Sequence, residues 1–215
     1  MEKTASKRNV PPIIRKILDI DVKLTEKFVL WANQFVPLRS LRTHYKILEI
    51  SCHGIAWFAC WIAFMWVYTS KSLVQMQINM LLGLIIDIVL IAVIKAYTRR
   101  RRPPANKNDS FAEMGPDKFS FPSGHASRAA YVAYFFCNLY PLPIIFWLPV
   151  LSWATSVSLS RVLLNRHHVL DVIVGVLLGI LEGILLGFLW LDQETALWMW
   201  NSLTDEKLQG GEFHV

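Results

Sequence analysis

The sequence FPSGHASR, from Phe121 to Arg128, marks the point where a polar loop meets an apolar helix. Gly124 lets the backbone approach a ligand closely, and the amide N–H groups at the start of the helix can bind an anion. The Ser123 hydroxyl adds a further donor, and His125 lies on the first turn, where it can protonate a leaving oxygen. This stretch predicts phosphate chemistry at one end of a helix.

The chain around this stretch is strongly apolar. Of its 215 residues, 54% are hydrophobic and 18% are charged, a composition typical of a polytopic membrane protein. The net charge of +6 suggests a nucleic-acid partner, but membrane proteins carry Lys and Arg for topological reasons, so we expect none. The three cysteines lie in apolar stretches and indicate packing, not disulfides or a metal site: Cys52, Cys60 and Cys137.

Five apolar segments predict an all-α fold, a polytopic membrane bundle of about five spanning helices. The segments lie at residues 47–68, 75–97, 125–140, 144–160 and 169–191, and the first matches the ~20 residues that a bilayer core requires. The last segment carries a glycine at every fourth position, which puts these residues on one helix face and predicts close helix packing: Gly175, Gly179, Gly183 and Gly187.

The segments before and after the spans complete the predicted domain organisation. Residues 1–12 form a mobile tail, 13–46 an interfacial amphipathic region, 47–191 the membrane domain and 192–215 a polar C-terminal tail. Apolar residues recur at helical spacing over 13–36, with charged residues between them, which favours a helix lying in the membrane interface. Packing of the same helix on the protein's own body explains the pattern equally well.

Hairpin counting puts the polar clusters on one side of the membrane. The 98–122 loop joins the end of the second span to the start of the third, and the 161–168 turn returns to the same side. This side carries 20 of the 22 Lys and Arg residues, and only Lys71 and Lys207 lie opposite. By the positive-inside rule we expect this face to be cytoplasmic.

Three basic residues on this face are candidate phosphate ligands. Lys95 and Arg102 are seven residues apart, so a helix that persists to Arg102 places them on one face, two turns apart. Arg161 can supply a second bidentate fork for phosphate oxygens. The neighbouring run from Arg99 to Arg101 is interpreted instead as a topogenic or lipid-headgroup patch.

His167 and Asp171 are the candidate nucleophile and its partner. They are four residues apart at the start of the fifth span, so a helix would bring them to one face, where the carboxylate orients the imidazole. His168 reaches Asp171 only at a spacing of three and ranks second, as a headgroup-binding or supporting residue. Asp87 and Glu182 lie inside spans and are expected to be protonated or paired across helices.

Three motifs together resemble the signature of the type 2 phosphatidic acid phosphatase family, which includes the vanadium haloperoxidases. They are Lys95-x6-Arg102-Pro103, Pro122-Ser123-Gly124-His125 and Ser160-Arg161-x5-His167-x3-Asp171. Within the family, the strings FSFPSGHASRAA and SRVLLNRHHVLD and the RRRRP run most resemble the polyisoprenoid diphosphate (presqualene diphosphate) phosphatase branch.

The resemblance implies a metal-independent lipid phosphatase that needs no cofactor and works through a phosphohistidine. His167 would attack phosphorus with Asp171 orienting it, and His125 would protonate the leaving group. The implied phosphate-binding residues are Lys95, Arg102, Ser123, Gly124 and Arg161. The missing sixth span is a departure from the family pattern, because the amphipathic 13–36 helix stands where many members have a transmembrane helix.

The expected substrate is a polyisoprenoid diphosphate or monophosphate held in the lipid bilayer. The branch resemblance and the predicted orientation favour an endoplasmic reticulum or nuclear-envelope enzyme whose active site faces the cytoplasm. Phosphatidate, lysophosphatidate or sphingosine phosphate is the alternative substrate class. A non-catalytic membrane scaffold and a vanadate-dependent oxidase are the alternatives of other kinds.

Overall fold

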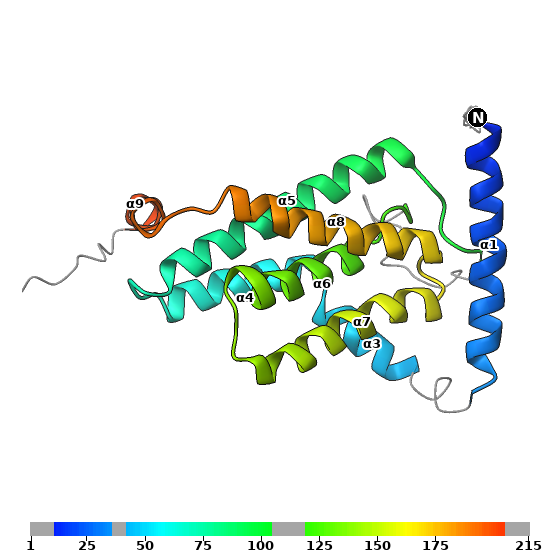
Figure 1. Cartoon of the computed structure of the whole chain (residues 1–215), viewed down its shortest axis with the longest axis horizontal. Helices are drawn as coiled ribbons and strands as arrows, with labels where there is room; N and C mark the ends of the chain where they lie inside the picture. Colours follow the sequence, from blue (N-terminus) through cyan, green and yellow to red (C-terminus); the bar gives the residue numbers. More distant parts are fainter. Residues whose placement is uncertain (1–10, 36–41, 105–118, 205–215) are drawn as a thin grey trace, which may run out of the picture.

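The computed structural model describes residues 11–35, 42–104 and 119–204, and these are helical without any strand (Figure 1). The helices are α1 (Pro12–Asn33), α3 (Arg42–Ser51), α4 (Gly54–Val67), α5 (Val74–Thr98), α6 (Gly124–Tyr134), α7 (Trp147–Leu163), α8 (Val169–Phe188) and α9 (Gln193–Leu203). A π-helical turn, η3 (Phe135–Leu139), extends α6, and a 3-10 turn, η4 (Ile144–Phe146), precedes α7. The predicted all-α class is confirmed.

Three helices in the described chain are long and apolar enough to cross a membrane. They are α5, the continuous helix Ile144–Leu163 and α8, and the bent pair of α3 and α4 makes a fourth if it counts as one span. The segment predicted as the third span is α6 with η3, which is shorter than the ~20 residues of a full crossing. Its α6 part is buried at every position from Ala126 to Ala133, so it is the central helix of the bundle.

The first predicted span is broken rather than straight. Between α3 and α4 the axis bends by 54°. Arg128 of α6 holds this break, because its Nη1 donates to the Cys52 carbonyl at 3.1 Å and its guanidinium lies where a side chain at Gly54 would be. Its Nη2 donates to Asp87 at 2.7 Å, so Asp87 is paired across helices, as expected.

The glycine face of α8 packs directly on α6, as predicted. A Cβ atom at Gly175 would clash with the carbonyl oxygen of Ser123, and one at Gly179 with that of Ser127. At Gly183 the clash would be with the ring of Tyr134. The close approach fixes the start of α8 against the start of α6, where the candidate site lies.

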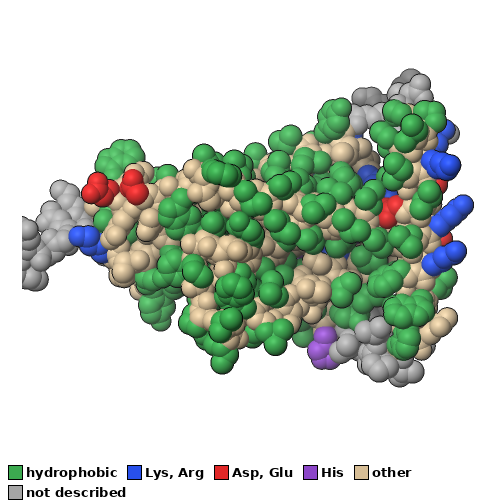
Figure 2. All heavy atoms as spheres, in the orientation of Figure 1, with side chains coloured by type: hydrophobic (Ala, Val, Ile, Leu, Met, Phe, Trp, Pro, Cys, Tyr) green, Lys and Arg blue, Asp and Glu red, His purple; other side chains and the backbone are tan. Residues whose placement is uncertain are grey.

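The outer surface is that of a membrane protein with one basic end. Figure 2 shows hydrophobic side chains over the length of the bundle, and Lys and Arg side chains along the outer edge of the end where α1 lies. Large apolar residues that are more than 70% exposed include Ile55, Trp66, Ile144, Leu148 and Phe188. Such exposure is costly in water and indicates contact with lipid.

Helix α1 lies across one end of the bundle, as Figure 1 shows. One stripe of it is buried against the body of the protein: Asp21, Thr25, Val29 and Ala32. Its apolar residues Ile13, Ile17 and Leu24 stay exposed, so packing on the protein's own body accounts for one face of the helix, and a position in the membrane interface stays a prediction for the other. The segment predicted as a polar C-terminal tail contains α9, whose Ala196 and Trp200 are buried in a cluster with α4 and α5 residues.

Candidate active site

The predicted site residues meet at the end of the bundle that α1 covers. Lys95 lies in the last turn of α5, Ser123 is the N-cap of α6, Arg161 lies in the last turn of α7 and His167 precedes α8. Lys95, Ser123, Arg161 and His167 are all buried. The charges of Lys95 and Arg161 lower the pKa of both His125 and His167, and the charge of Arg102 lowers the pKa of His167 as well. The three motifs therefore converge, as hairpin counting predicted, but α5 ends at Thr98, so the predicted helix face shared by Lys95 and Arg102 is wrong.

His167 is held by a backbone carbonyl. Its Nδ1 donates a hydrogen bond to the Ser120 carbonyl oxygen at 2.7 Å, which leaves Nε2 as the nitrogen with the free lone pair. Burial lowers the pKa of His167 well below its ordinary 6.5, and the charges of Arg102, Lys95 and Arg161 lower it further. The imidazole is therefore neutral at neutral pH, the form that a nucleophile requires.

The carboxylate of Asp171 lies beside His167, but the two residues do not share a helix face and the expected hydrogen bond between them is not formed. Helix α8 begins at Val169, so His167 lies before it, and its Nδ1 is 4.0 Å from Asp171 Oδ2. Instead Oδ2 accepts the backbone N–H of His168 at 2.8 Å and lies 3.2 Å from its Nδ1. Asp171 thus caps the start of α8 and binds His168, while Ser120 orients His167.

Arg100 corrects the interpretation of the arginine run. Arg99 and Arg101 are exposed, which fits a headgroup or topogenic role, but Arg100 points inward. Its Nη1 donates to Asp171 Oδ1 and its Nη2 to Asp21 Oδ2, both at 2.6 Å. The side chain therefore links the start of α8 to α1. A carboxylate near the start of an apolar helix, such as Asp171, requires a charged partner. The sequence does not show that this partner is Arg100.

Ser123 and Gly124 form the N-terminal end of α6. The Ser123 Oγ accepts the N–H of Ala126 at 3.4 Å, so its own hydroxyl proton is available to a ligand. The Ser123 N–H donates to the Asp171 carbonyl at 2.9 Å, which ties this end of α6 to α8. Phosphate oxygens placed here would meet the positive end of the helix dipole.

Glu49 of α3 is not among the predicted site residues, but it lies against Arg161 and His125. Its Oε1 is 3.0 Å from Arg161 Nη1, and its Oε2 is 3.7 Å from Arg166 Nη2. Its backbone carbonyl is 3.2 Å from Nε2 of His125, which donates to it. A carboxylate is thus bound by the arginine that is expected to bind phosphate, and substrate must compete with it.

We expect Glu49→Gln to bind phosphate more tightly than the native chain. The amide keeps the size of the side chain but removes the competing negative charge from Arg161. The dissociation constant of inorganic phosphate, measured as competitive inhibition, should fall severalfold. Glu26→Gln, an exposed acid on α1, makes the same charge change and should leave it unaltered. Weaker phosphate binding by Glu49→Gln would contradict the competition.

One group of acidic and histidine side chains in the described chain is compact enough to hold a metal ion: Asp21, His168 and Asp171. The guanidinium of Arg100 bonds both carboxylates at 2.6 Å. A cation supplied by the protein itself therefore already lies between them.

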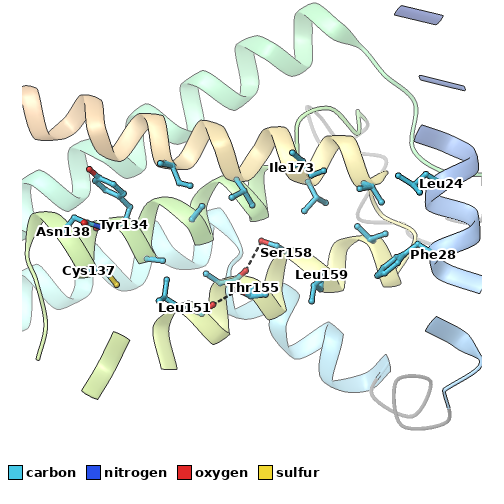
Figure 3. Close-up of a pocket in the computed structure, with 18 residues that line it drawn as sticks. Leu24, Phe28, Tyr134, Cys137, Asn138, Leu151, Thr155, Ser158, Leu159 and Ile173 are labelled. Atoms are coloured by element: carbon cyan, nitrogen blue, oxygen red, sulfur yellow. Dashed lines mark hydrogen bonds between the residues drawn. The ribbon is translucent and has the colours of Figure 1, made fainter. Parts of the chain in front are cut away.

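An apolar groove of about 620 Å³ starts beside this site, between α6, α7 and α8. Figure 3 shows Leu24 and Phe28 of α1 at one end and Tyr134, Cys137 and Asn138 at the other. The hydroxyls of Thr155 and Ser158 lie in its wall, but each donates to a backbone carbonyl of α7 at 2.8 Å. The groove is therefore suited to a hydrocarbon chain.

Comparison with known proteins identifies the family. Residues 77–195, which contain all three motifs, match the model of the PAP2 superfamily. The chain belongs to the PAP2 superfamily. A probable lipid phosphate phosphatase beta of Arabidopsis thaliana is 31% identical over 187 residues, covering 75% of this chain and 84% of that protein. The resemblance drawn from the motifs is confirmed, and the protein is a membrane phosphatase of the hydrolase class.

Two solved structures share the fold of this PAP2 protein. The transmembrane PAP2-type phosphatidylglycerolphosphate phosphatase of Bacillus subtilis has a TM-score of 0.57 at 26% identity, covering 81% of this chain and 86% of that one. LpxE of Aquifex aeolicus has a TM-score of 0.56 at 24% identity, covering 75% of this chain and 92% of that one.

Proposed function

We propose that this PAP2 phosphatase removes phosphate from isoprenoid diphosphates or monophosphates of the presqualene or farnesyl type. The observation that carries the proposal is a buried, neutral His167 surrounded by three cations, together with an apolar groove whose lining includes Val162 and Val169, close in the chain to Arg161 and His167. The FSFPSGHASRAA and SRVLLNRHHVLD strings support an isoprenoid rather than a glycerolipid tail, through their resemblance to one branch of the family.

The reaction begins with attack of His167 Nε2 on the terminal phosphorus. The negative charge of the bound substrate favours a protonated His125, and the Nε2 of this imidazolium donates its proton to the leaving oxygen as the bond from phosphorus breaks. Lys95, Arg102 and Arg161 stabilise the charge that spreads over the equatorial oxygens. The Ser123 hydroxyl and the Gly124 amide complete the phosphate-binding set.

In the second step, His125 removes a proton from water, and the resulting hydroxide attacks the phosphohistidine. The bond between nitrogen and phosphorus breaks, inorganic phosphate leaves and His167 returns to its neutral state. Before either step the substrate must displace the Glu49 carboxylate from Arg161, and His125 must exchange its bond to the Glu49 carbonyl for one to the leaving oxygen.

The proposed orientation places the site on the cytoplasmic face of the endoplasmic reticulum or nuclear envelope. The bias of 20 Lys and Arg residues to this side supports it. Helix α1 fits the same interface, because its exposed apolar residues can enter the headgroup boundary. Isoprenoid diphosphates made by soluble enzymes would reach the site from this side.

The substrate proposal is tested by comparing farnesyl diphosphate with phosphatidate in mixed micelles. We expect kcat/KM to be at least about tenfold higher for farnesyl diphosphate, because a single flexible chain suits the apolar groove between α6, α7 and α8. His167→Ala serves as the background control for both substrates. Faster hydrolysis of phosphatidate would assign the protein to the glycerolipid phosphatases.

A further inference from the structure

We infer that Asp21 on the N-terminal helix α1 is a positioning residue for the nucleophile His167, and that it acts through Arg100. The inference rests on the proposed phosphatase site but not on the choice of lipid. It makes α1 a working part of the active site, although α1 lies outside the stretch that matches the family model.

Asp21 is only 6% exposed and both of its oxygens are bound. Oδ2 accepts from Arg100 Nη2 at 2.6 Å, and Oδ1 accepts the backbone N–H of Leu170 in the first turn of α8 at 2.9 Å. One turn further along α1, Thr25 Oγ1 accepts the N–H of Val169 at 3.0 Å. Two N–H groups that α8 cannot satisfy itself are therefore capped by α1.

Arg100 transmits this attachment to His167 in two ways. Its side chain bonds Asp171, which caps the turn that carries His167 and His168. Its backbone carbonyl accepts the Ser120 N–H at 2.8 Å, and the Ser120 carbonyl accepts the His167 Nδ1 proton at 2.7 Å. A continuous set of bonds thus runs from α1 to the nitrogen that fixes the tautomer and direction of the nucleophile.

The neighbouring acid on α1 shows that these contacts are particular to Asp21. Asp19 lies two residues away on the same helix but is exposed. A buried carboxylate is costly unless it is paired, and Asp21 meets this requirement with an arginine that Asp171 also needs. Since Asp21 touches none of Lys95, Arg102 or Arg161 in these bonds, its loss should alter the placement of His167 and leave phosphate binding intact.

The test is Asp21→Asn in the full-length protein, with Asp19→Asn as the matched control. Asparagine can still accept the Leu170 N–H but offers Arg100 no charge. We expect kcat to fall about tenfold or more, with KM and the inhibition constant of inorganic phosphate within twofold of the native values. Asp19→Asn should match the native protein in all three.

A double variant separates positioning from general destabilisation. If Asp21 acts through Arg100, Asp21→Asn combined with Arg100→Gln should be no slower than Arg100→Gln alone. Losses that multiply, or native kcat in Asp21→Asn, would overturn the inference.

Should Asp21→Asn fail to fold in detergent, Arg100→Lys tests the same link, because a lysine cannot bridge two carboxylates as the guanidinium fork does. A tenfold loss of kcat at unchanged KM supports the inference, and native kcat overturns it. If His167→Ala is inactive while these variants turn over normally, only the inference fails. If His167→Ala also retains activity, the proposed function fails with it.

Discussion

His167→Ala is expected to reduce phosphate release from farnesyl diphosphate by at least about 10³-fold, because it removes the nucleophile of a two-step reaction. The native histidine is buried and neutral. Its Nδ1 bonds the Ser120 carbonyl, which fixes the ring orientation and leaves the Nε2 lone pair free for attack. The measurement is the steady-state release of inorganic phosphate in mixed micelles, with the thermal unfolding midpoint recorded to show that the variant is folded.

His168→Ala is the matched control for this change. His168 contacts the Asp171 carboxylate and caps the same helix, so its loss should cost far less than that of His167. If His168→Ala were inactive and His167→Ala active, the roles of the two neighbouring histidines would have to be exchanged.

Arg161→Gln is expected to lower kcat/KM by about 10²-fold. Its guanidinium side chain is 1% exposed and is the fork that Glu49 binds. The Arg161 charge also lowers the pKa of His167, so its removal should raise that pKa. The nucleophile is active when neutral, and the acid limb of the remaining activity should therefore move to higher pH.

Arg101→Gln provides the comparison for Arg161→Gln. Arg101 belongs to the same basic face but is exposed, so kcat/KM and the pH profile should stay close to the native ones in micelles. An equal loss in both variants would mean that the whole basic face, and not a particular phosphate ligand, supports the reaction.

Much of the site could be predicted from the sequence because its residues lie at helix ends. Once the spans were drawn, hairpin counting alone put Lys95, Ser123 and His167 on one face. The glycine spacing of α8 likewise predicted its packing on α6, since a period of four places small residues on one side of any helix. Both predictions rest on patterns within one helix or between consecutive helices, which do not depend on contacts between distant segments.

The rest depended on contacts between distant segments. The bend between α3 and α4 comes from Arg128, which lies more than 70 residues away in the chain. Asp21 and Glu49 looked like ordinary charges in amphipathic or flanking segments, because no spacing rule reveals that an acid faces an arginine of another helix. Asp171 was expected to orient His167, but its carboxylate bonds His168 and Arg100, because the start of α8 could not be fixed to one residue from the sequence.

The central claim is that a phosphoryl group is carried by His167, and trapping it is the most direct test. The enzyme would be mixed with farnesyl diphosphate radiolabelled in its terminal phosphoryl group and quenched within one turnover. We predict label on the protein that is stable in base and labile in acid, as a phosphohistidine is, and its absence in His167→Ala. Label in His167→Ala, or turnover by the native enzyme with no labelled protein at any quench time, would contradict the account.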